Sequence, residues 1–157
     1  MATFGTFVAG QVLTAAELNS AGSWQTYTPT FSQSATITKT VNWARYMQLN
    51  DLVIVNLKMT ASSAGTANNE IKVGLPVNAS ANNFLMGTML FMDDSFGGDP
   101  VSFSIAIYDS TSAVKFRAPT SGQSEALADY VGLTASDQAW TVASGDAIWV
   151  QLTYEAA

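Results

Sequence analysis

The chain has 157 residues, of which 48% are apolar and 11% are charged, and its net charge is −6. This length fits one domain with its own core, while the charged share is below half of the roughly 25% usual for soluble domains, so we expect part of the surface to be covered. Six scattered Lys and Arg residues argue against nucleic-acid binding. The absence of cysteine and histidine excludes disulfides, a zinc site and any triad that needs imidazole.

No segment of the chain predicts secretion or membrane insertion. The N-terminus lacks a basic start and a continuous apolar run, and no stretch approaches the roughly 20 apolar residues of a membrane span. If the protein acts outside a cell, we expect it to leave by another route, such as lysis of an infected cell.

Residues 1–22 predict an N-terminal arm with a short helix. Thr14 and Glu17 match a capping box, and Leu13 and Leu18 match the hydrophobic staple that accompanies it. A helix of about two turns is too short to be stable alone. The arm either packs on its own domain or docks on another subunit, and we favour docking. The predicted attachment residues are Phe4, Phe7, Val12, Leu13 and Leu18.

Residues 23–157 predict a β domain whose centre is a long hairpin over residues 42–60, with a polar turn at residues 50–51. Side chains alternate between the two faces of a strand, and every other residue of the second strand is apolar. The predicted core face therefore carries Val53, Val55, Leu57 and Met59. Because Leu52 and Ile54 make the opposite face unusually apolar, we expect another strand or subunit to cover it.

Further strands are predicted along the rest of the domain, at residues 24–31, 36–39, 70–76, 83–92, 101–108, 113–117 and 146–154. The apolar run at 83–92 is expected to be buried on both faces, with its methionines as core filler. A helical turn is expected near residues 125–130. Many short strands without βαβ alternation predict an all-β fold, an antiparallel β-sandwich of the jelly-roll type.

The acidic cluster Asp93, Asp94 and Asp99 is the candidate for a metal site, because Ca²⁺ takes oxygen ligands from flexible turns. Its spacing matches no EF-hand, and a solvated turn is the favoured interpretation. Catalysis without His or Cys would need paired carboxylates, as in glycosidases. We predict no catalytic residue and no cofactor.

Aromatic residues offer a second possibility, since an aromatic ring packs on the apolar face of a sugar. Tyr130 and Trp140 lie in the irregular late part of the chain, where binding loops are common, and are the candidate glycan-binding residues. The alternative is that they are core or interface anchors. For Trp24, Trp43 and Trp149, which fall in predicted strands, the core or interface role is the expectation.

Several stretches carry a family resemblance. Residues 9–19 (Ala-Gly-Gln-Val-Leu-Thr-Ala-Ala-Glu-Leu-Asn) and residues 24–30 (Trp-Gln-Thr-Tyr-Thr-Pro-Thr) are similar to motifs at the start of a distal β-domain. Residues 44–49 (Ala-Arg-Tyr-Met-Gln-Leu) are similar to a Gly-x-Tyr-x-x-x-Gly strand, although Ala44 and Asn50 stand where glycine is common. With the closing strand, these stretches resemble short tail-fibre and minor tail proteins of tailed bacteriophages.

The resemblance implies a protein of the virion surface, commonly a homotrimer, without implying a particular receptor. We therefore expect a tail-fibre-like receptor-binding protein without catalysis, held to other virion proteins by its arm, with a host glycan or protein as its target. The alternative is a capsid decoration or head-fibre protein that binds only other virion subunits. A glycan-cleaving enzyme is the third and weakest hypothesis.

Overall fold

The computed structural model describes residues 22–67, 69–97, 100–119, 130–132 and 141–157. The predicted N-terminal arm, with its short helix and its attachment residues, lies outside these ranges. The described chain consists of strands, connecting loops and one short 3₁₀ helix, η1 (Asp94–Phe96). In chain order the strands are β1 (Gln25–Thr26), β2 (Phe31–Gln33), β3 (Ala35–Thr36), β4 (Lys39–Leu49), β5 (Leu52–Ala61), β6 (Ile71–Gly74), β7 (Leu85–Met92), β8 (Pro100–Ser110), β9 (Ala113–Pro119), β10 (Tyr130–Gly132) and β11 (Ala147–Glu155).

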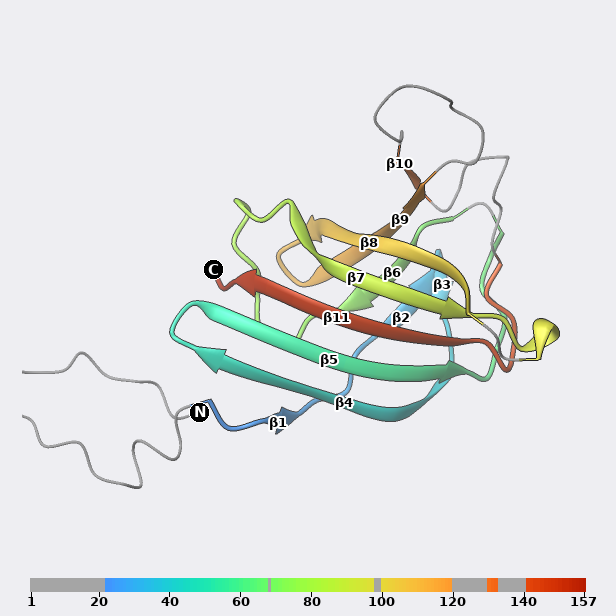
Figure 1. Ribbon diagram of the computed structural model, residues 1–157, viewed down its shortest axis with the longest axis horizontal. Coiled ribbons are helices and arrows are strands. Elements are labelled where there is room, and N and C mark those ends of the chain that lie inside the picture. The colour runs from blue at the N-terminus through green and yellow to red at the C-terminus, as the bar shows by residue number, and fades with distance from the viewer. Residues whose placement is uncertain (1–21, 68, 98–99, 120–129, 133–140) are drawn as a thin grey trace, which may run out of the picture.

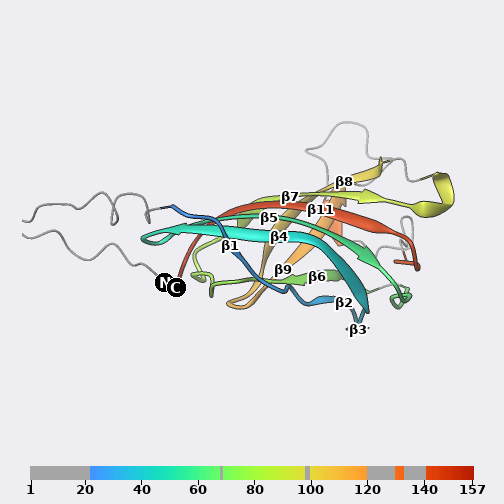
Figure 2. The ribbon, with the colours of Figure 1, turned by 90° about the horizontal axis from the view of Figure 1, so that it is seen from below.

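These strands form one antiparallel, 11-stranded sheet in the order β1-β4-β5-β11-β7-β8-β9-β6-β2-β3, with β10 paired to β9 (Figure 1). The sheet curls into a half-barrel, so that β4, β5, β11 and β7 lie over β9, β6 and β2 (Figure 2). The prediction of an all-β antiparallel fold is confirmed. The more specific prediction of a jelly-roll sandwich is not, because the described strands are hydrogen-bonded in one continuous sheet.

Two short crossings bring the ends of this curled sheet together. The chain passes from β1 to β2, and again from β3 to β4, across the open side of the half-barrel. At the first crossing the Tyr27 amide donates to the Ala44 carbonyl (3.3 Å), and at the second the Ile37 amide donates to the Phe31 carbonyl (2.8 Å). The chain itself thus covers the side that hydrogen bonding between strands leaves open.

The predicted central hairpin is confirmed as β4 and β5. Its register ends at Leu49 opposite Leu52, which leaves Asn50 and Asp51 as the turn. Asn50 has a φ of 52°, in the left-handed region that asparagine adopts more readily than most residues. The inward side chains of β5 are buried as predicted: Val53, Val55, Leu57 and Met59.

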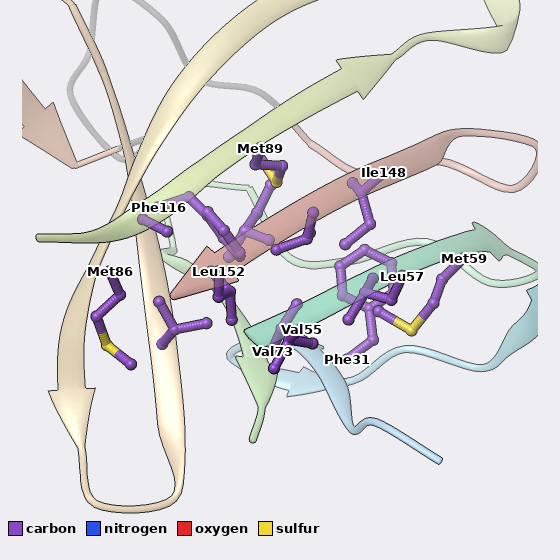
Figure 3. Packing of buried hydrophobic residues seen from close by; sticks show 14 of the residues in the cluster. Phe31, Val55, Leu57, Met59, Val73, Met86, Met89, Phe116, Ile148 and Leu152 are labelled. Atoms are coloured by element: carbon purple, nitrogen blue, oxygen red, sulfur yellow. The ribbon is translucent and has the colours of Figure 1, made fainter. Parts of the chain in front are cut away.

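The closing strand, β11, lies between β5 and β7 and is paired with both. Its alternation is as predicted, with Ile148, Val150, Leu152 and Tyr154 buried. Figure 3 shows Leu152 of this strand near Val55 of β5 and Ile148 near Leu57, with Phe31 of β2 in the same cluster. The last strand of the chain therefore completes the middle of the sheet.

One buried amide ties two loops to this core. Gln33 is fully buried, and its Nε2 donates to the Asn69 carbonyl (3.1 Å) while its Oε1 accepts from the Val142 amide (3.1 Å). Satisfying both ends of the amide offsets the cost of removing it from water.

The prediction that residues 83–92 are buried on both faces is wrong. Only one face of β7 is buried, and Leu85 at its start is 63% exposed. A register shift at Gly87 turns both Met86 and Met89 inward, so these two methionines are core filler as expected. Gly87 has a φ of 152°, and an added Cβ would lie 2.0 Å from the Gln151 carbonyl oxygen, so the irregularity requires glycine.

The later elements follow the predictions in part. The hairpin predicted at 101–108 and 113–117 is present as β8 and β9, with its turn at residues 111–112. Tyr130 belongs to strand β10 and not to the helical turn expected near residues 125–130. The rest of that segment, residues 125–129, lies outside the described ranges.

Replacing Val55 with alanine should lower the free energy of unfolding by about 2–4 kcal/mol, because it opens a cavity in the core. The control is its neighbour on the outer face, Asn56, for which alanine should change stability by about 0.5 kcal/mol or less. Denaturant titration measures both, and equal losses would show that the faces of β5 are assigned wrongly.

Two tyrosines, the buried Tyr154 and the half-buried Tyr27, predict how stability depends on high pH. Burial raises the pKa of the Tyr27 phenol and of the Tyr154 phenol above the ordinary value of 10.0. The Tyr154 hydroxyl donates to the Val77 carbonyl (2.8 Å). The folded state thus holds these protons more tightly than the unfolded state. Their contribution to stability is fully present below about pH 10 and is lost as the pH rises above it.

In a tyrosinate absorbance titration, two of the five tyrosines should therefore ionise only as the protein unfolds. Tyr27→Phe and Tyr154→Phe should each remove one late-titrating group. Ionisation of all five tyrosines near pH 10 with an unchanged circular dichroism spectrum would contradict this.

Candidate functional site

Two tryptophans lie side by side on the outer face of β4, β5 and β11. Trp43 is opposite Lys58 in the register of β4 and β5, and Lys58 is opposite Trp149 in the register of β5 and β11. The two indoles meet edge to face, with 6.4 Å between ring centroids and 71° between planes. They are 40% and 43% exposed. We call this surface, together with Trp24, Arg45, Asn56 and Gln151, the outer tryptophan face.

An irregularity in β4 turns Trp43 outward. The register shifts between Val41 and Trp43, so that Asn42 is an extra residue without a partner of its own. Val41 packs against the core and Ala44 is buried, while Asn42 and Trp43 are both exposed. A strict two-residue alternation from Val41 would have directed Trp43 into the core.

The backbone of β11 turns Trp149 outward without any irregularity. Its neighbours Ile148 and Val150 are buried, so regular alternation places Trp149 on the outer face with Gln151. β11 is paired with β5 and β7, and β4 is paired with β5 and, beyond Trp43, with β1. Both indoles therefore project from paired strands, which limits their movement.

Two cations contact the indoles of this face. The Lys58 Nζ lies 4.9 Å from the centroid of the Trp149 ring, and the Arg45 Cζ lies 4.9 Å from that of Trp24 and 5.8 Å from that of Trp43. Such cation–π contacts contribute about 0.5–1 kcal/mol at exposed sites. They hold the two side chains against the sheet.

A shallow groove of about 350 Å³ lies beside the two indoles. Its lining residues are Trp43, Asn56, Leu57, Thr88, Leu90, Trp149, Val150 and Gln151. Asn56 and Gln151 are opposite each other in the register, and neither amide has a side-chain hydrogen-bond partner within the part of the chain that the structure describes. Amides offer both donors and acceptors, so the groove combines aromatic surface with free hydrogen-bonding groups.

The sequence prediction missed this site. The core role expected for Trp24, Trp43 and Trp149 is wrong, because all three are at least 40% exposed. For Trp149 the signal was present, since the alternation of the closing strand already placed it with Gln151. For Trp43 no local signal predicted the extra residue in β4. Whether these tryptophans contact another subunit stays a prediction.

The predicted glycan-binding residues are not brought to this groove within the described chain. Tyr130 begins β10, which pairs with β9, whereas the outer tryptophan face lies on β4, β5 and β11. Trp140 lies outside the described residues. Their role in binding stays a prediction.

In the predicted calcium cluster, Asp93 has a structural role. Its Oδ1 accepts from the Ser95 amide (2.8 Å) and the Ser95 hydroxyl (2.5 Å), which caps η1. The Asp94 amide donates to Oδ1 of the buried Asp146 (3.1 Å). No group of three or more acidic residues placed to hold a metal ion is present among the described residues, and Asp99 lies outside them, so a calcium site stays a prediction.

A separate apolar surface lies at one end of the half-barrel. Phe84 and Leu85 are 76% and 63% exposed, and Leu52 is 43% exposed. They lie near the end of the chain, because Leu52 is opposite Glu155 in the register and the Glu155 carbonyl accepts from the Asn83 side chain. Figure 1 shows the start of the described chain, the C-terminus and the β4–β5 turn at this same end. We call it the apolar end.

Comparison with known proteins adds no identification. No protein-family model matches the chain, and no curated protein or solved structure is detectably similar to it. The resemblance to tail-fibre proteins therefore stays a prediction. Within the described ranges no helix has the length and apolar character needed to cross a membrane.

Proposed function

We propose that the protein is a non-enzymatic receptor-binding protein of the virion surface, similar to a tail fibre, and that it binds a host-surface glycan at the outer tryptophan face. The observation that carries the proposal is the pair Trp43 and Trp149, exposed side by side over a groove that also presents Asn56 and Gln151. Indoles pack on the apolar faces of sugar rings, and amides exchange hydrogen bonds with their hydroxyls.

The lining and the volume of the groove support binding without cleavage. Its described lining contains no carboxylate, so it lacks the acid and base that glycoside hydrolysis uses. Its volume of about 350 Å³ is at the small end for ligand sites, which suits one or two sugar rings and a weak single contact. A homotrimer that displays three such grooves would gain avidity by linking the contacts.

The apolar end supports attachment of the domain to the particle at this end of the half-barrel, away from the outer tryptophan face. Phe84, Leu85 and Leu52 expose apolar surface near the point where the described chain begins. In the proposed arrangement the arm and this end face the particle, within a jelly-roll-like trimer, and the outer tryptophan face is presented to the host. The second candidate, a capsid decoration or head-fibre protein, rests on the apolar end alone, which suits contact with other virion subunits.

Glycan-array binding tests the proposal. The purified protein should bind a restricted set of glycans, and Trp43→Ala or Trp149→Ala should each weaken binding by about tenfold, the effect of losing about 1.4 kcal/mol of aromatic contact. Phe84→Ala is the control, because Phe84 is more exposed than either tryptophan but lies at the apolar end.

Selective binding that survives both tryptophan substitutions would move the site elsewhere, and Tyr130 and Trp140 would then be tested in the same way. Binding to no glycan would favour the capsid decoration or head-fibre role. Release of reducing sugar from host polysaccharide would revive the enzyme hypothesis.

Removal of the arm tests the attachment part of the proposal. A protein that starts at Ser23 should keep its β-rich circular dichroism and its oligomeric state, because β1 starts at Gln25 and the described core uses no earlier residue. It should fail to join particles in an assembly assay. An unfolded product would show that residues 1–22 are part of the domain.

A further inference from the structure

We propose that the outer tryptophan face selects acidic glycans, in which a sugar carries a carboxylate or another anionic substituent. This inference rests on the proposed function and names the chemical class of its ligand. The observation behind it is that two cations of this face, Arg45 and Lys58, form no ion pair with a described carboxylate although the protein is acidic.

Arg45 and Lys58 form no ion pair with any carboxylate that the structure describes. By contrast, Lys72 of β6 and Lys115 of β9 both form ion pairs. Lys72 binds Asp109 at 2.9 Å, and Lys115 lies 3.3 Å from Glu70.

The protein carries a net charge of −6, so it does not lack carboxylates that could neutralise these two cations. The paired lysines belong to β6 and β9, and Figure 2 shows these strands across the half-barrel from β4, β5 and β11. Lys39, at the far end of β4, also forms no ion pair with a described carboxylate. Arg45 and Lys58 together nonetheless place two unpaired positive charges beside the groove, where they favour an anionic ligand.

The indoles of Trp24 and Trp43 restrict the Arg45 side chain in a conformation that can bind an anion. Its guanidinium carbon lies 4.9 Å from the Trp24 ring centroid and 5.8 Å from that of Trp43, and these contacts restrict the side chain before any ligand arrives. A guanidinium held against aromatic rings still has N–H groups to donate, and it can bind a carboxylate through two parallel hydrogen bonds. Less conformational entropy is then lost on binding.

Lys58 gives the groove a second positive group of a different kind. It is opposite both Trp43 and Trp149, and its Nζ lies 4.9 Å from the Trp149 ring centroid. An acidic sugar packed on Trp149 would place its anionic group near this ammonium, while Arg45 lies one row further along the sheet, opposite Asn56. Adjacent sugars of an acidic polysaccharide could meet the two cations in turn.

The test measures binding of the full chain to an acidic oligosaccharide built from uronic acids and to the same oligosaccharide with its carboxyl groups reduced to alcohols. We expect the acidic form to bind about tenfold more tightly, because charge-assisted hydrogen bonds are the stronger ones. The preference should shrink as salt is raised, since exposed charges are screened. Sulfated and phosphorylated saccharides form separate arms, which identify the anionic group that is preferred.

Arg45→Gln and Lys58→Gln should each reduce binding of the acidic form several-fold and reduce binding of the carboxyl-reduced form by less, so that the preference for the acidic form shrinks. Lys39→Gln is the matched control, because Lys39 is a cation of the same strand as Arg45 but is opposite Ala61, at the far end of β4. Lys39→Gln should change binding of neither the acidic nor the reduced oligosaccharide. Circular dichroism of each variant checks that the fold is retained.

The outcomes separate this inference from the proposed function. If acidic and reduced forms bind equally, and Trp149→Ala weakens binding of both about tenfold, the glycan-binding function stands and the charge selectivity is wrong. If neither form nor any arrayed glycan binds, both proposals fail. If Trp43→Ala or Arg45→Gln instead dissociates the oligomer in sedimentation, the face is a contact between copies of the chain, and the inference is also overturned.

Discussion

The pairing of β11 with β5 on one side and β7 on the other is the constraint on which the rest of the structure depends. It joins the β4–β5 hairpin to the remaining strands and makes one sheet of them. Its inward residues, among them Ile148 and Leu152, fill the core, and its outward residues complete the outer tryptophan face. Because the middle of the sheet comes from the end of the chain, these contacts are non-local, which is typical of slow-folding β proteins.

Two local irregularities adapt this sheet to its curvature and to its surface. The extra residue Asn42 in β4 directs Trp43 to the outside, and Gly87 in β7 lets both Met86 and Met89 point into the core. In each case a single backbone position changes which face its neighbours occupy. A register irregularity therefore places core side chains in β7 and a surface side chain, Trp43, in β4.

The two roles proposed for the domain, attachment at the apolar end and ligand binding at the outer tryptophan face, follow from where its exposed apolar residues lie. Phe84 and Leu85 lie at the end of the half-barrel where the described chain begins and ends, while Trp43 and Trp149 lie on the face of the sheet. Apolar surface without polar groups suits burial against protein, whereas indoles next to Asn56 and Arg45 suit a polar ligand with apolar ring faces. In the proposed function, one domain would attach to the particle at one surface and bind the host at another.

The sequence by itself determined which residues alternate between core and surface in β5 and in β11, and it located the β8–β9 hairpin, because alternation and tight turns are local properties of the backbone. It did not determine that β11 occupies the middle of a single curled sheet, because pairing partners are chosen by non-local hydrogen bonds and packing. Only the tertiary structure placed Trp43 beside Trp149, since that contact needs both the irregularity at Asn42 and the position of β11 next to β5.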